Sequence, residues 1–155
     1  MEYGRIERSI YIEATPDVVY EVLSSPEHLT EWWPDEVVDL KPVPGSVGEL
    51  VWGDRTSRDG HVARITVVDA QPPRLFSFRW VHLADGAAAS DGSLLVTFEL
   101  VASGEGTTVH MTETGFREMG WEAAVLEEQY RSHVEGWDRH LPLLAECSSR
   151  LGAER

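Results

Sequence analysis

The chain has 155 residues, a length typical of one domain, and its composition is 42% hydrophobic and 26% charged, near the average of globular proteins. Acidic side chains outnumber basic ones by 27 to 13, for a formal net charge of −14. Nucleic acids and anionic membrane surfaces are bound by clustered Lys and Arg, so this balance argues against both as partners. Tryptophan, in contrast, is frequent, with six residues.

The first ten residues, MEYGRIERSI, lack the apolar segment of a signal peptide, and no apolar run in the chain approaches the ~18 residues of a membrane span. The single cysteine, Cys147, excludes an internal disulfide and a multi-cysteine metal site. It has no activating neighbour in the sequence, so we expect an inert thiol. We therefore expect a soluble, cytoplasmic protein with a single domain spanning residues 1–155.

The first predicted element is a strand over 5–13, in which Ile6, Ile10 and Ile12 share one face. Thr15 and Pro16 are typical of an N-cap and a first helical position, so a helix follows and ends near Ser25. We expect its inward face to carry Val18, Val19, Val22 and Leu23. By the same logic Pro26 starts a second short helix, which ends at Trp33-Pro34.

Between Val37 and Phe116 the hydrophobic period changes to two, which indicates strands. Pro-Gly, Asp-Gly, Pro-Pro and Gly-Glu-Gly sequences separate them as hairpin turns. The stretch 83–91, rich in Ala, Gly, Ser and Asp, predicts a flexible hairpin loop. The predicted strands are Val37–Leu40, Gly48–Trp52, His61–Ala70, Arg74–His82, Gly92–Val101 and Thr107–Phe116.

After Gly120 the pattern becomes helical to about Leu151, and Pro142 within it predicts a bend rather than an end. One face of this helix forms an apolar and aromatic stripe, and Glu122, Glu128, Arg131, Glu135 and Arg139 lie on the opposite side. The stripe consists of Leu126, Tyr130, His133, Val134, Trp137, His140, Leu141, Leu144 and Leu151.

This order of elements predicts an α+β fold: a curved antiparallel sheet of about six or seven strands, wrapped around a long C-terminal helix, with two short helices after the first strand. A sheet of this size curls as it twists, and one helix cannot fill its concave side. We therefore expect a cavity between helix and sheet, lined by tryptophans.

Several motifs occur in an order and spacing that resemble the helix-grip fold of START-like (SRPBCC) proteins and, within it, the family named after the activator of the Hsp90 ATPase. They cover nearly the whole chain, although none is specific alone. The resemblance implies a pocket between the long helix and the sheet, which different members use for lipids, polyketides or hormones, and it transfers no catalytic motif. The matching stretches are Ile10–Tyr20, Leu29–Trp33, Pro44-Gly45, Pro72–Leu75 with Phe78 and Trp80, Gly115-Phe116, and Gly136-Trp137 with Leu141 and Leu144.

The aromatic residues have two interpretations. An aromatic face at strand or helix spacing is ordinarily core packing. Alternatively, some of these rings line a ligand cavity, where indole N–H groups find partners in water or ligand. We prefer Trp33, Trp80 and Trp137 as wall residues, with Trp52 directed at the same cavity. The full set of predicted ligand-binding residues is Trp33, Trp52, Phe78, Trp80, Phe98, Met111, Glu113, Tyr130, His133, Trp137 and His140.

Two histidines, His133 and His140, fall within the helix stripe. They are two turns apart, about 10.5 Å along the axis, which excludes chelation of one metal ion with bonds of ~2 Å. The run after His133 also departs from the zinc signature H-E-x-x-H. The simplest interpretation is a core or rim histidine bonded to backbone, and the alternative is a polar anchor for a ligand hydroxyl or carboxylate. No metal or cofactor is implied.

Glu113 shares strand parity with Val109 and Met111, so a regular strand would direct it inward. There it would need a partner or a raised pKa, and His133, His140 and Arg64 are the candidates. Inward, Glu113 would be a general base or a ligand anchor. The alternative, which we narrowly favour, is that a bulge or the strand's end turns it to solvent.

We expect the chain to bind a small, largely hydrophobic or aromatic molecule, as a monomer or homodimer and more readily as a binder than as an enzyme. The enzyme alternative is a polyketide cyclase/aromatase-like activity with Glu113 and His133 as candidate catalytic residues. A third hypothesis is a co-chaperone of the stress response that activates an Hsp90-type ATPase. Eukaryotic family members carry an additional N-terminal domain for that activity, and these 155 residues do not contain it.

Overall fold

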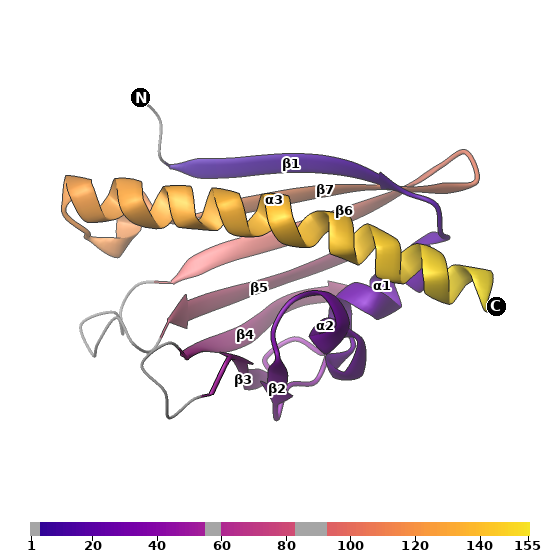
Figure 1. The fold of residues 1–155 in the computed structure, drawn as a ribbon, viewed down its shortest axis with the longest axis horizontal. Coiled ribbons are helices and arrows are strands. Elements are labelled where there is room, and N and C mark those ends of the chain that lie inside the picture. Colours follow the sequence, from indigo (N-terminus) through magenta and orange to yellow (C-terminus); the bar gives the residue numbers. More distant parts are fainter. Residues whose placement is uncertain (1–3, 55–59, 83–92) are drawn as a thin grey trace.

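A computed structural model describes residues 4–54, 60–82 and 93–155. Within them the long C-terminal helix lies across one face of an antiparallel sheet, and two short helices close one end (Figure 1). The elements are β1 (Arg5–Ile12), α1 (Pro16–Ser24), α2 (Pro26–Trp32), β2 (Glu36–Val38), β3 (Val47–Trp52), β4 (His61–Gln71), β5 (Leu75–His82), β6 (Leu94–Ser103), β7 (Gly106–Thr114), the 3₁₀ helix η3 (Arg117–Met119) and α3 (Ala123–Ala153).

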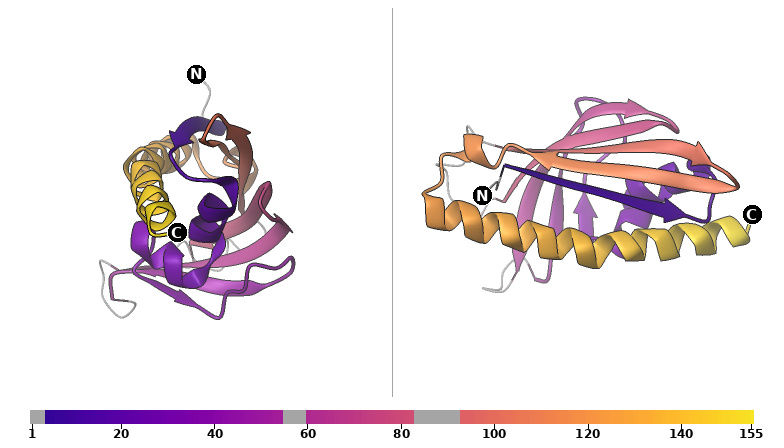
Figure 2. Two further views of the ribbon diagram at one scale, coloured as in Figure 1. Left: turned by 90° about the vertical axis from the view of Figure 1, so that its right-hand side faces the viewer. Right: turned by 90° about the horizontal axis from the view of Figure 1, so that it is seen from above.

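The seven strands described form one sheet in the order β1-β7-β6-β5-β4-β3-β2, with every neighbouring pair antiparallel. The sheet curves around α3, as the end-on view of Figure 2 shows. Alternate residues of each strand therefore face the helix and form the core, for example Phe76, Phe78 and Trp80 of β5. This is the α+β helix-grip arrangement predicted from the sequence, and that prediction is confirmed.

The predicted elements all occur, with ends that coincide or differ by at most three residues. Two strands end early because the backbone turns to positive φ: Asp39 (φ 59°) follows β2, and Gly115 (φ 107°) follows β7. The predicted hairpin loop over 83–91, and the predicted strand start at Gly92, lie outside the described residues.

Helix α1 starts as its sequence predicts. The backbone N–H of Val18 donates to Oγ1 of Thr15, and Pro16 occupies the first turn. The four residues expected on its inward face are all buried: Val18, Val19, Val22 and Leu23. Their packing fixes α1 against the C-terminal half of α3, and α2 with its terminal tryptophans follows directly.

Helix α3 runs through Pro142 without ending. Its predicted stripe faces the sheet, with Trp137, Leu141 and Leu144 fully buried. The predicted polar side is exposed along the whole helix. In the described parts of the chain, no helix combines the length and the apolar character needed to cross a membrane.

A polar cluster ties the ends of the three helices together. The Glu21 carboxylate of α1 accepts from Arg155 Nη1 at 2.6 Å and from Nη2 at 2.9 Å. His28 of α2 lies between two carboxylates, with Nδ1 2.9 Å from Glu31 Oε1 and Nε2 3.0 Å from Glu21 Oε2. The hydrogen bond to Glu31 raises the pKa of His28 against the opposing effect of partial burial, and Arg155 lowers the pKa of Glu21.

This cluster predicts a pH dependence of stability with a definite sign. Because the pKa of His28 is raised on folding, its contribution is complete below the ordinary value of about 6.5 and is lost as pH rises through the folded value. The free energy of unfolding of the wild type should therefore fall, between about pH 6 and pH 8, more steeply than that of His28→Gln. Urea unfolding at both pH values measures this, with His110→Gln, an exposed histidine of β7, as control. Equal slopes for the wild type and His28→Gln would contradict the assignment.

Candidate functional site

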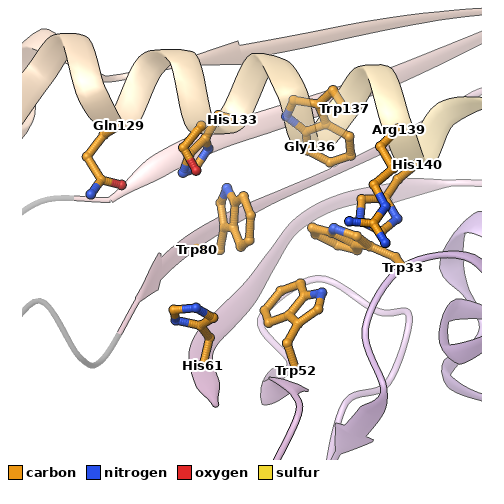
Figure 3. A pocket seen from close by; sticks show the side chains of 11 residues that line it. Trp33, Trp52, His61, Trp80, Gln129, His133, Gly136, Trp137, Arg139 and His140 are labelled. Carbon is orange, nitrogen blue, oxygen red and sulfur yellow. The ribbon is translucent and has the colours of Figure 1, made fainter. Parts of the chain in front are cut away.

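A cavity of about 480 Å³ lies between the first half of α3 and the β3–β5 side of the sheet (Figure 3). It reaches the surface, since His61, Ser132 and Arg139 of its lining are exposed. The side chains of α3 face those of Trp33, Trp52, His61 and Trp80 across it. The lining residues are Trp33, Trp52, His61, Trp80, Gln129, Ser132, His133, Gly136, Trp137, Arg139 and His140.

Four indole rings from four different segments form most of the apolar wall. Trp33 is central, with ring centroids 5.1 Å from Trp80, 5.2 Å from Trp137 and 5.7 Å from Trp52. Behind it, Trp32 stacks on Trp33 at 5.7 Å and an interplanar angle of 17°. Tilted and edge-to-face contacts at these distances stabilise rings beyond the area they bury, by about 0.5–1.5 kcal/mol for each pair. The wall is therefore a packed aromatic surface.

Local sequence explains how each ring arrives there. Trp33 caps α2 at φ −127° and ψ −92°, outside the helical region, so the helix ends at the residue whose ring lines the cavity. Trp32 stays within α2 and donates its indole N–H to the carbonyl of Val22 at 3.0 Å. Trp80 occupies an inward position of β5, and Trp52 is the last residue of β3. Trp137 is the centre of the α3 stripe.

Behind this wall lies one buried carboxylate, Glu113, with 0% exposure. Its Oε2 accepts from Trp80 Nε1 at 2.7 Å, and its Oε1 accepts from Trp137 Nε1 at 2.8 Å and lies 2.9 Å from His133 Nδ1. Indole N–H groups only donate and a carboxylate only accepts, so the proton of His133 in this pairing is on Nδ1. Glu113 thus links β5, β7 and α3 and fixes the orientation of three rings that border the cavity.

The favoured sequence interpretation of Glu113, a turn to solvent, is wrong. Strand β7 pairs without a break on both sides, and Glu113 lies opposite Ile6 of β1 and Val96 of β6. The strand ends only at Thr114, so parity holds through Glu113. Of the three partners considered, His133 is the one bonded, whereas Arg64 is exposed on β4.

The second stripe histidine has a structural partner. His140 Nδ1 lies 2.9 Å from the backbone carbonyl of Trp32 and connects α3 to the end of α2. The imidazole must donate in this bond, because the carbonyl only accepts. The two histidines thus have different anchors, and both rings border the cavity. Among the described residues, no group of three or more His, Cys, Asp and Glu could hold a metal ion.

The family model described as "Activator of Hsp90 ATPase homolog 1-like protein" matches residues 13–149. The chain belongs to this family. No curated protein matches it. Among solved structures, protein MLL2253 from Mesorhizobium loti is similar with a TM-score of 0.75 and 24% identity, over 94% of this chain and 97% of that one.

Two further neighbours show the same fold. The Aha1 dimer from Colwellia psychrerythraea has a TM-score of 0.66 and 19% identity, over 94% of this chain and 96% of that one. DynU16, from the dynemicin biosynthetic locus, has a TM-score of 0.70 and 20% identity, and the match covers 92% of this chain but 46% of DynU16. At these identities the likeness concerns the fold.

Within this family fold, the residues predicted as ligand-binding separate into two groups. Trp33, Trp52, Trp80, His133, Trp137 and His140 line the cavity. The other five lie behind or beside it: Phe78, Phe98 and Met111 are buried in the core, Glu113 holds the wall, and Tyr130 donates to the carbonyl of Arg5 at 2.7 Å.

Five lining residues were missed from the sequence: His61, Gln129, Ser132, Gly136 and Arg139. Four of them lie on one flank of the α3 stripe rather than at its centre, since positions 129, 132, 136 and 139 recur at helical spacing. The available sequence signal for this flank was Gly136, whose lack of a side chain leaves space beside the helix. Arg139, expected to point away, reaches the rim beside His140 (Figure 3).

The single cysteine lies apart from this site. Cys147 is buried, with Sγ 3.6 Å from the carbonyl of Glu31, and it is not among the lining residues. Burial raises the pKa of its thiol, which disfavours the reactive thiolate. This agrees with the inert role expected from the sequence.

Proposed function

We propose that this chain binds a small, planar aromatic molecule in the cavity between α3 and the sheet. The observation that carries the proposal is the wall of four indoles, Trp33, Trp52, Trp80 and Trp137, around about 480 Å³ of space. Ligand pockets are concave, mostly apolar and commonly about 300–1,000 Å³, with a few fixed polar groups. The histidines, held by Glu113 and by the Trp32 carbonyl, supply such groups here.

The rigidity of the wall favours a flat ligand over a flexible chain. A planar ring system has few rotatable bonds and loses little conformational entropy when it packs between aromatic side chains. A fatty acyl chain, in contrast, loses rotamer entropy when it is ordered. We therefore expect a planar flavone such as apigenin to quench the tryptophan emission in a saturable manner, and palmitate to leave it nearly unchanged.

Gly136 offers a matched pair of variants for this test. Among the described residues, no atom beyond its own stretch of helix lies within 4 Å of a Cβ built at this position, and the residue lines the cavity. Gly136→Ala should stabilise the helix by about 0.5–1 kcal/mol and keep ligand binding. Gly136→Leu should fold equally well, project its side chain into the cavity and weaken binding at least tenfold in the emission titration. Unchanged binding by Gly136→Leu would remove the cavity as the binding site.

A second candidate, cyclase-like acid–base chemistry, is favoured by one feature. His133 borders the cavity with Nδ1 held 2.9 Å from a buried carboxylate, the orientation in which an imidazole can exchange a proton through Nε2. The neighbour from the dynemicin locus suggests a polyketide as the substrate to assay. Turnover by the wild type and its loss in His133→Gln would support this candidate. The third hypothesis, activation of an Hsp90-type ATPase, is supported by the description of the family model. No feature of the described cavity adds support for it.

A further inference from the structure

The polar side chains of the cavity have a charge character opposite to that of the whole molecule. The chain carries 27 acidic and 13 basic residues, yet no Asp or Glu belongs to the described lining. The lining instead contains the guanidinium of Arg139 and three imidazoles, those of His61, His133 and His140. Because acidic residues outnumber basic ones about twofold in this chain, residues placed at random in the lining would include more acidic than basic side chains.

The buried carboxylate of Glu113 does not offset the basic character of the described lining. Glu113 is fully buried behind the indoles, and its two oxygens accept from Trp80, Trp137 and His133. It is not among the residues that line the cavity. A ligand in the cavity therefore meets the Arg139 guanidinium and imidazole rings, while the acidic oxygens of Glu113 lie on the far side of the wall.

The net charge of −14 would repel an anion at long range, but this repulsion is weak at the cavity. At physiological ionic strength the field of exposed charges decays over about 8 Å. A guanidinium within hydrogen-bond distance of a carboxylate acts at under 3 Å and forms a charge-assisted pair, roughly twice as strong as a neutral hydrogen bond. The contact with the guanidinium therefore outweighs the long-range repulsion, and the cavity should prefer an anionic ligand to a neutral one.

We propose that the ligand is an aromatic anion, a planar ring system with a carboxylate that Arg139 binds at the rim while the rings enter between the indoles. This inference rests on the proposed binding function and specifies its ligand class. Arg139 lies beside His140 and near Trp33 (Figure 3), and it is an exposed residue of the cavity lining. A carboxylate there keeps part of its hydration, which limits the cost of its burial.

Two probes of equal shape test the charge directly. Naphthalene-2-carboxylate and naphthalene-2-carboxamide share the ring system and differ in the charge of one group. We expect calorimetric titration of the wild-type protein to show the carboxylate binding at least about tenfold more tightly, the effect of one charge-assisted hydrogen bond. Arg139→Gln should abolish this preference, with most of the loss in the affinity for the carboxylate. Arg131→Gln, a change of equal charge on the same helix but outside the lining, should keep the preference.

Each outcome has a distinct meaning. Equal affinity of the wild type for the two probes would overturn the anionic ligand class and leave the aromatic cavity in place. A preference that survives in Arg139→Gln would overturn the role of Arg139. Failure of both probes to bind would overturn the proposed function itself, and this inference with it.

Discussion

Glu113→Leu should lower the free energy of unfolding by about 3–5 kcal/mol, the loss typical of removing one partner from a buried charged network. Leucine fills a similar volume but accepts no hydrogen bond, so the ring N–H groups of Trp80, Trp137 and His133 lose their acceptor inside the protein. Total stabilities are commonly 5–15 kcal/mol, so the variant should be partly unfolded at elevated temperature.

The isosteric variant Glu113→Gln should lie between the wild type and Glu113→Leu, with a loss of about 1–3 kcal/mol. An amide has one acceptor oxygen and one NH₂ group, whereas the site places an indole N–H against each carboxylate oxygen. In either orientation of the amide, one of the two indoles therefore faces another donor. A decrease in stability from the wild type through Glu113→Gln to Glu113→Leu is the order expected if Glu113 acts as a hydrogen-bond acceptor.

Urea unfolding followed by far-ultraviolet circular dichroism measures this series, because that signal reports mainly the backbone, whereas tryptophan fluorescence would also respond to the changed surroundings of Trp80 and Trp137. Glu99→Gln is the control, since Glu99 is an exposed carboxylate on the adjacent strand β6 and should change stability by less than about 0.5 kcal/mol. A leucine variant as stable as the wild type would show that the three ring N–H groups do not depend on Glu113.

The fold could be predicted from the sequence because its signals are local and periodic. Alternation placed Phe76, Phe78 and Trp80 on one face of β5, and helical spacing placed Trp137 on the inner face of α3. Thr15 and Pro16 fixed the start of α1 to the residue. These patterns follow from the spacing of residue types along the chain, so they can be recognised without knowledge of the tertiary contacts.

The site was less predictable because it depends on what lies opposite each residue. Parity indicated that Glu113 points inward, but a bulge or the end of the strand could have turned it to solvent, and a buried carboxylate is costly unless it is partnered. Three donors, from β5 and from two positions on α3, remove that cost, and they are 20, 24 and 33 residues away. Arg139 was missed for a similar reason. The helical period identifies the residues of the buried stripe, whereas the cavity opens at the edge of that stripe.

Trp33→Ala should lower the free energy of unfolding by about 3 kcal/mol, toward the lower end of the values for removing a buried aromatic ring. The ring is 8% exposed and contacts three other wall indoles, so its removal takes away both apolar burial and several ring pairs. One side already borders the cavity, which moderates the loss because fewer packed neighbours are left facing new empty space.

The same substitution should enlarge the cavity and weaken aromatic binding, since it removes a ring whose centroid lies within 5.7 Å of those of the other three. Near-ultraviolet circular dichroism, which reports the ordered environment of indoles, should lose intensity by more than one residue's share, because Trp52, Trp80 and Trp137 each lose a neighbour at 5.7 Å or less. Trp121→Ala is the matched control: this indole is partly buried and lies outside the lining, so stability should fall less and binding should persist. Equal effects of the two substitutions on spectrum and binding would mean that the four indoles do not act as one wall, and the proposed aromatic site would lose its basis.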